Sequence, residues 1–114
     1  MSPTAIQRKQ LLKALLDNRN VTSVDVREIT LDPGEHAGRH LHPSAFLGYI
    51  VSGTAVYPIE GESLETLPAG SAFYELAETV IADFGNASSD VPMTFVAFYL
   101  LDGDQSIITM LENK

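Results

Sequence analysis

Residues 38–43 of this chain are Gly38-Arg39-His40-Leu41-His42-Pro43. In an extended strand, side chains two positions apart point to the same side, so His40 and His42 can converge on one point. Neutral imidazole is the commonest protein ligand of divalent transition metals, and such a site needs three or four donors. The stretch therefore supplies half of a metal site, and the rest of the sequence decides whether the site is completed.

The composition is that of one globular domain and excludes several classes of function. The chain has 114 residues, of which 45% are hydrophobic and 19% charged, and it contains no cysteine, so thiolate sites and disulfides are excluded. Its net charge of −8 repels phosphate backbones and anionic lipids, and we expect neither nucleic acid nor membrane as a partner. The N-terminus lacks the apolar core of a signal peptide, which predicts a cytoplasmic protein.

Residues 1–20 are predicted to form an N-terminal helical segment, with a short amphipathic helix from Ser2 to about Asp17. Its apolar side would consist of Ile6, Leu11, Leu12, Leu15 and Leu16. A helix with such a face needs a surface to cover, on its own domain or on a second subunit. We therefore expect a homodimer.

Residues 21–114 have the texture of a second, all-β unit, in which short runs of β-branched and aromatic residues alternate with turn signals. The predicted strands are residues 21–31, 39–42, 46–51, 54–59, 63–67, 71–75, 79–84, 92–101 and 106–111. Many short strands at this spacing are typical of a sandwich or barrel. The run at 93–101 would be apolar on both faces of a strand rather than on one face only. This pattern predicts a central strand that is covered on both faces.

The spacing of glycine, histidine and proline resembles the two sequence motifs of the cupin superfamily, which are small jelly-roll barrels. The first motif corresponds to Gly34, His40, His42, Phe46 and Gly53, and the second to Gly61, Pro68, Gly70, Ile81 and Asn86. The resemblance covers about residues 21 to 105. It implies an antiparallel jelly-roll β-barrel with a ligand or metal site inside.

The resemblance also implies a metal held by two His and one Glu from the first motif and one His from the second. This chain keeps His40 and His42 but has Phe46 and Ile81 in the other two positions. These bulky apolar side chains would remove two donors and make the cavity smaller and less polar. We therefore predict a pocket lined by His40, His42, Phe46 and Ile81 with a degenerate metal site.

One carboxylate could restore a third donor. If Ile81 faces inward in a regular strand, Asp83 two residues later faces inward as well, giving a metal set of His40, His42 and Asp83. The alternative is that the strand has already left the barrel at this point, with Asp83 solvated or paired with Arg39.

Two further residues have the chemistry of a ligand. Glu75 is a second candidate donor, with the alternative that it is a rim carboxylate bonded to backbone near Leu76. His36 extends the pair to a His-x-x-x-His-x-His run, but it follows the Pro33-Gly34 turn, and we expect it on a surface loop.

These observations leave three hypotheses about function. The first is a module that binds a small organic molecule in a mostly apolar pocket. The alternative is a metal-dependent cupin enzyme, of the isomerase, decarboxylase or dioxygenase type, with one divalent transition metal (Fe, Mn, Ni or Zn) on a non-standard ligand set. A third is a structural unit that assembles as a homodimer.

Overall fold

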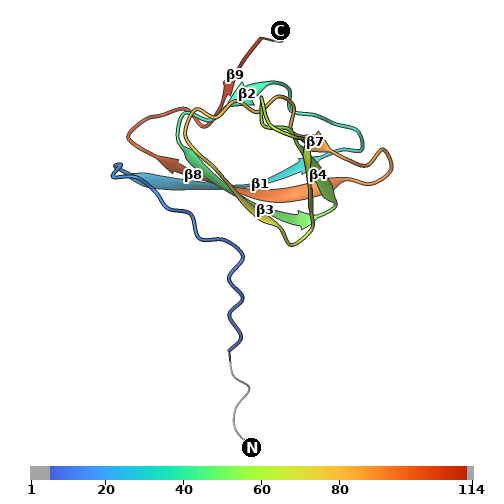
Figure 1. Cartoon of the computed structure of the whole chain (residues 1–114), viewed down its shortest axis with the longest axis horizontal. Coiled ribbons are helices and arrows are strands. Elements are labelled where there is room, and N and C mark those ends of the chain that lie inside the picture. The colour runs from blue at the N-terminus through green and yellow to red at the C-terminus, as the bar shows by residue number, and fades with distance from the viewer. Residues whose placement is uncertain (1–5, 113–114) are drawn as a thin grey trace, which may run out of the picture.

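A computed structural model describes residues 6–112, which form an all-β domain (Figure 1). Its strands are β1 (Ser23–Leu31), β2 (His40–Leu41), β3 (Ala45–Ser52), β4 (Thr54–Tyr57), β5 (Glu65–Pro68), β6 (Ala72–Glu75), β7 (Gly85–Asn86), β8 (Met93–Leu101) and β9 (Thr109–Met110). They pair antiparallel in sheets of order β1-β8-β3-β6, β5-β4-β7 and β2-β9. The predicted antiparallel jelly-roll architecture is confirmed.

Strand β8 is one of the two inner strands of the four-stranded sheet, with β1 on one side and β3 on the other. Its residues alternate between buried and partly buried along its whole length, because one face lines the barrel and the other lies on the outside of the sheet. The predicted burial of both faces is therefore met on the inner face, whereas the outer face is only partly buried within the described residues. The inner face contributes Phe95, Ala97 and Tyr99 to the core.

A glycine lets the core aromatic rings approach the backbone of β3. Gly48 is directly opposite Phe73 of β6, and a Cβ atom at Gly48 would lie 2.3 Å from the Phe73 ring. Phe73 is thereby able to lie across β3 and contact both Phe46 and Tyr57. The lack of a side chain at Gly48 thus leaves room for the Phe73 ring inside the barrel.

The predicted N-terminal helix is not formed. Residues 6–20 have no regular secondary structure, and residues 1–5, which the prediction also included, lie outside the described residues. Figure 1 shows this segment lying away from the barrel and leading into the start of β1. An isolated helix of this length is only marginally stable in water, because helix nucleation is unfavourable and packing against another surface is needed to stabilise it. Within residues 6–112 no helix is long and apolar enough to cross a membrane.

The predicted strand at residues 79–84 is also wrong in part. Ile81 alone is paired there, by bridges to His40 and Ile59, and the chain bends at Ala82 before it enters β7. The N–H of Ala82 donates to the carbonyl of Pro58. This bend ends the regular alternation of side chains that the prediction assumed.

Candidate functional site

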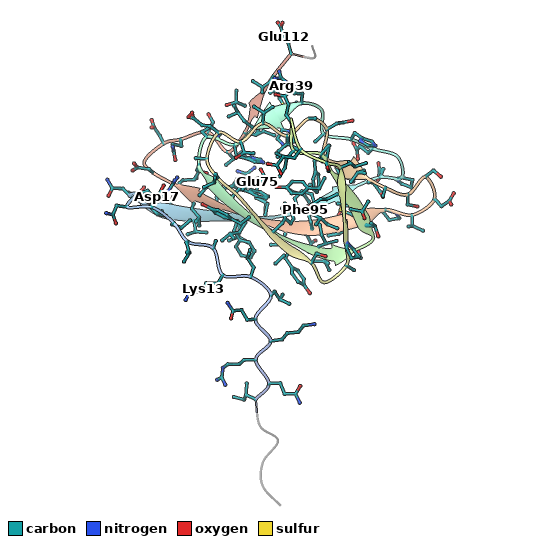
Figure 2. All side chains as sticks on the ribbon, in the orientation of Figure 1. Lys13, Asp17, Arg39, Glu75, Phe95 and Glu112 are labelled. Carbon is teal, nitrogen blue, oxygen red and sulfur yellow. The ribbon has the colours of Figure 1, made fainter. Side chains whose placement is uncertain are left out.

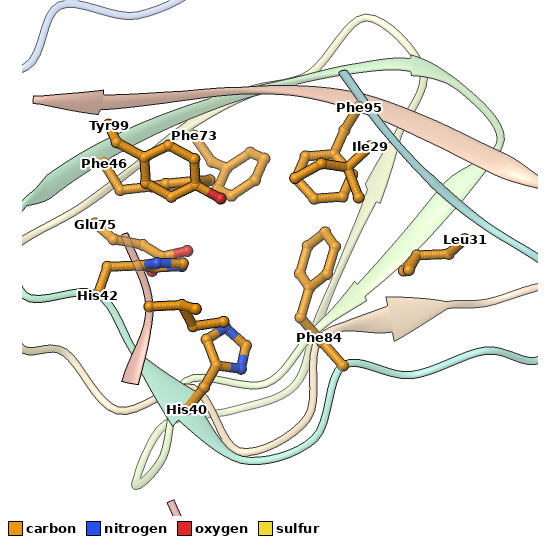
Figure 3. A pocket seen from close by; sticks show the side chains of 12 residues that line it. Ile29, Leu31, His40, His42, Phe46, Phe73, Glu75, Phe84, Phe95 and Tyr99 are labelled. Carbon is orange, nitrogen blue, oxygen red and sulfur yellow. The ribbon is translucent and has the colours of Figure 1, made fainter. Parts of the chain in front are cut away.

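A cavity of about 160 Å³ lies inside the barrel (Figure 3). Its walls come from β1, β2, β3, β6 and β8 and from four loops. They consist of Ile29, Leu31, Ala37, His40, His42, Phe46, Phe73, Glu75, Phe84, Phe95, Tyr99 and Ile108. Most of these side chains are apolar. His40, His42 and Glu75 are the charged or ionisable exceptions besides the Tyr99 phenol, and Figure 3 shows them gathered on one side of the space.

Backbone carbonyl groups fix the tautomers of both histidines. Nδ1 of His40 lies 2.7 Å from the carbonyl oxygen of Gly38, and Nδ1 of His42 lies 2.7 Å from that of Ile107. A carbonyl oxygen only accepts, so each Nδ1 carries the hydrogen and donates it. In the neutral rings, Nε2 therefore keeps a free lone pair.

Glu75 is a buried carboxyl group on the same side of the cavity. Its residue is 4% exposed, and its Oε1 atom has no hydrogen-bond partner among the described residues. Burial raises the pKa of Glu75 to about 7, against a smaller lowering effect of the Tyr57 hydroxyl. Glu75 is therefore an acid that changes its protonation state near neutral pH.

His42 and Glu75 lie close together without forming a hydrogen bond. His42 Nε2 lies 3.8 Å from Glu75 Oε1, which is beyond hydrogen-bond length. Burial lowers the pKa of His42, against the raising effect of its bond to the Ile107 carbonyl, so the imidazole is uncharged at neutral pH. The ring of His42 also stacks on Phe46, with centroids 4.6 Å apart and planes 6° from parallel.

The structure brings three of the four predicted pocket residues to the cavity. His40, His42 and Phe46 line it, and the rings of the two histidines have centroids 5.1 Å apart. Ile81 is fully buried in the core next to His40, with which it exchanges two backbone hydrogen bonds, but it is not among the lining residues. Ile81 supports the His40 strand rather than facing the cavity.

Asp83 does not join the histidine pair. Its side chain is 49% exposed, its Oδ2 lies 3.1 Å from His36 Nδ1, and its Oδ1 accepts a hydrogen bond from the N–H of Gly38. The bend at Ala82 turns it away from the cavity. Arg39, the alternative partner considered from the sequence, forms its ion pair with Glu60 instead.

The expected rim position of Glu75 is wrong as well. The residue occupies the last position of β6, opposite Phe46, and its side chain enters the barrel rather than bonding to backbone near Leu76. Alternation from Phe73, which also faces inward, would have identified this position from the sequence. The aromatic rings of Phe84, Phe95 and Tyr99 complete the walls. Their positions in the sequence do not separate them from ordinary core residues.

The side chains as arranged do not fit a resident metal ion. Two imidazole nitrogens are available, but across residues 6–112 no group of three or more His, Asp or Glu side chains is placed to hold a metal. Phe46 stacks on His42 where a carboxylate donor would be needed. The cavity is better described as an apolar space with one polar side.

An antiparallel barrel with an interior cavity and a His-x-His pair on its wall belongs to the class of jelly-roll domains. The family model described as "Cupin domain" matches residues 27–99, and the chain belongs to this family. None of the curated proteins that were compared with the chain matches it.

Several solved structures have the same fold. A cupin-like protein from Thermotoga maritima is 18% identical, with a TM-score of 0.68 over 79% of this chain and 65% of that chain. An uncharacterised protein with a double-stranded β-helix domain from Klebsiella pneumoniae is 22% identical, with a TM-score of 0.65 over 83% of this chain and 84% of that one. A DMSP lyase from Ruegeria pomeroyi is 17% identical, with a TM-score of 0.67 over 77% of this chain and only 43% of the lyase. At these identities the likeness concerns the fold.

Proposed function

We propose that this protein binds a small organic molecule inside the barrel. The observation that carries the proposal is an apolar cavity whose polar side chains are gathered on one side. Apolar cavities of about 150 Å³ are known to accommodate benzene, so the volume here suits a ligand of roughly that size. A mostly apolar pocket with a few convergent polar groups is the usual form of a small-molecule site.

Probe binding to a cavity-filled variant tests this proposal. We expect benzyl alcohol to bind the wild-type protein with a Kd at or below about 1 mM, monitored by amide chemical shifts in NMR. Ala37 lines the cavity, so Ala37→Leu places three more carbon atoms there and should abolish binding. Ala87 is exposed, and Ala87→Leu is the matched control that should bind as the wild type does. Equal binding by both variants would contradict the pocket as the site.

The second candidate is a metal-dependent enzyme, and one observation favours it. Nδ1 of both His40 and His42 is held by a backbone carbonyl, which leaves Nε2 free as it is in metal-binding histidines. Fe, Mn, Ni or Zn would then need further donors from water or from a rearranged Glu75. The lyase named above is one example of an enzyme with this fold, but its activity does not transfer at 17% identity.

Elemental analysis separates the two candidates. The binding proposal predicts far less than one metal per chain after incubation with each of the four ions and desalting. Stoichiometric metal that disappears in the His40→Ala/His42→Ala variant would favour the enzyme. A cytoplasmic location, expected from the sequence, remains a prediction.

A further inference from the structure

The polar side of the cavity offers hydrogen-bond acceptors to a ligand. Because Nδ1–H of His40 and of His42 is already donated to a backbone carbonyl, each ring presents only the Nε2 lone pair. Both histidines are buried, so water does not readily satisfy these lone pairs. A ligand that brings N–H groups would pair with them, whereas a ligand that brings only acceptors would not.

Glu75 adds a third acceptor with a negative charge when it is ionised. Its Oε1 atom is buried, has no hydrogen-bond partner among the described residues, and lies 3.8 Å from the nearest imidazole nitrogen. A buried polar atom without a partner costs roughly 1–3 kcal/mol. Such an atom on the wall of a cavity points to a donor that arrives with the ligand.

The remaining walls favour a cation rather than an anion. Ring faces carry negative electrostatic potential and attract ammonium groups, and five aromatic side chains surround this cavity: Phe46, Phe73, Phe84, Phe95 and Tyr99. The whole chain has a net charge of −8. A carboxylate ligand would be repelled by the negative potential of the protein, by the Glu75 carboxyl group and by the Nε2 lone pairs of the two histidines.

We propose that the ligand is a small apolar primary amine, bound as its ammonium ion with the N–H groups directed to Glu75 and the two imidazoles. This inference rests on the proposed binding function. It specifies that the polar head is a cationic donor and that the apolar body, of about the size of benzene, contacts the rings.

Three probes with the same apolar body test the inference: benzylamine, benzyl alcohol and benzoate, each titrated at pH 8 in NMR. We expect benzylamine to bind at least tenfold more tightly than benzyl alcohol and benzoate to bind weakest. Glu75→Gln, which keeps the shape of the side chain, should reduce amine binding to the level of the alcohol. Glu28→Gln changes an exposed glutamate of β1 and is the matched control.

The outcomes separate the two proposals. Alcohol binding without a preference for the amine, or tightest binding of benzoate, would overturn the inference and leave the binding function in place. An amine preference that survives in Glu75→Gln would overturn the role of this residue. Failure of all three probes would overturn both.

A different part of the molecule carries a second inference. The segment of residues 6–20 is here called the arm, and Figure 2 shows it extending away from the barrel with its side chains spread on both sides. It exposes an apolar series along its length, with Ile6 at 75% and Leu15 at 80% exposure. Leu11, Leu12 and Leu16 are exposed as well. Ile6 and Leu15 are largely uncovered, whereas Leu11, Leu12 and Leu16 are covered over about half of their surface.

The outer face of the four-stranded sheet is the second open apolar surface. Val26, Phe98, Leu47 and Tyr74 form a row across β1, β8, β3 and β6 in the register of the pairs. Val26 is exposed, and the other three are only partly buried. An apolar row across a whole sheet is typical of a face that another layer covers.

The charges of the arm and the barrel are complementary. Four of the seven basic residues and one of the fifteen acidic residues lie in residues 1–20, which gives this segment +3 and residues 21–114 a net −11. The arm is therefore attracted to an acidic barrel at the same time as its leucines need cover.

We infer that a second copy of this chain docks on the outer sheet face and that the arms are exchanged, each covering the sheet of its partner. Because the same patch is used on both subunits, the assembly closes as a two-fold dimer. This accounts for an amphipathic segment that lacks cover in the single chain.

The mass in solution tests the arm exchange. At 50 µM chain, light scattering should give twice the chain mass. Leu11→Asp/Leu15→Asp should weaken the dimer at least tenfold, and Val26→Glu should do so from the sheet side. Gln10→Asp/Asn18→Asp introduces the same two charges at polar positions of the arm and should weaken the dimer much less than the leucine substitutions do, because it leaves the apolar side chains in place. A monomeric wild-type chain, or a dimer that resists both the arm and the sheet substitutions, would overturn the inference.

Discussion

Glu75 is a buried carboxyl group, and its burial has a consequence for stability. With a pKa raised from 4.5 to about 7, the folded protein still holds the proton over a pH range in which the unfolded chain has lost it. Stability from this group is therefore complete below about pH 4.5 and falls as the pH rises through 7.

Glu75→Gln should remove this dependence. Relative to the wild type, the variant should gain roughly 3 kcal/mol in the free energy of unfolding between pH 4.5 and pH 8, at about 1.36 kcal/mol for each unit of pKa shift. Urea titrations of both proteins across this range provide the measurement. His42 acts in the opposite sense, because its lowered pKa reduces stability as the pH falls below 6.5, so the difference between the two proteins is the readout. A difference that does not change with pH would contradict the burial of a neutral Glu75.

At the same scale, the sequence predicted the histidines but not their neighbours. His40 and His42 share a face as their spacing requires, whereas Asp83 was assigned by a regular alternation that ends at the bend of Ala82. A bend made by the Ala82 N–H bonding to the Pro58 carbonyl is a long-range contact, and no local pattern encodes it. Glu75 could have been predicted from the position of Phe73 two residues earlier.

At the scale of elements, Asn86 joins β7 to the end of β1 and to the loop that follows. Its Nδ2 group donates to the carbonyl oxygens of Leu31, Asp32 and Val91, while its Oδ1 accepts from the N–H of Ser88. Asn86→Asp keeps the shape of the side chain but replaces the NH₂ donor by a carboxylate oxygen, which would then face the three carbonyl oxygens. We expect a loss of about 2–4 kcal/mol in urea denaturation at pH 7, compared with almost none for Asn18→Asp in the exposed arm. Equal stability of the two variants would contradict this role.

The contact of β3 with β6 gives a second prediction for the elements. Gly48→Ala would place a methyl group in the buried Phe73 ring and should destabilise the fold by about 1–3 kcal/mol. Gly85→Ala would meet His36 at a similar distance, 2.2 Å, but that ring is partly exposed and can turn away. Thermal unfolding should therefore show a larger decrease for Gly48→Ala than for Gly85→Ala. The reverse order would mean that Phe73 adapts more easily than its burial suggests.

The elements themselves were largely predictable, because turn residues and β-branched runs mark the strands locally. The central place of β8 followed from its two apolar faces. The N-terminal helix was wrong for a physical reason: periodicity shows that a segment has an apolar face, not that anything covers it. The same leucines now identify the arm as a segment that needs a partner.

At the scale of the whole molecule, the charge is unbalanced within the barrel. Residues 21–114 carry fourteen acidic and three basic residues, and both arginines among them are already paired, Arg27 with Asp25 and Arg39 with Glu60. The remaining carboxylates repel one another, and this repulsion lowers the stability of the compact state. Salt screens exposed charges, with a Debye length of about 10 Å at 0.1 M and about 3 Å at 1 M.

Sodium chloride should therefore stabilise this protein. Between about 20 and 500 mM we expect Tm to rise by several degrees in thermal unfolding at pH 7.5, since partial relief of this repulsion on the order of 1 kcal/mol corresponds to about 4 °C for a domain of this size. Glu62→Lys/Glu65→Lys, at two exposed positions, should raise Tm at low salt and reduce the slope against salt concentration. Glu62→Asp/Glu65→Asp keeps the charge and should behave as the wild type. A Tm that falls with salt would contradict this prediction. It would mean that the exposed ion pairs stabilise the protein by more than the repulsion destabilises it, although surface ion pairs are expected to contribute little.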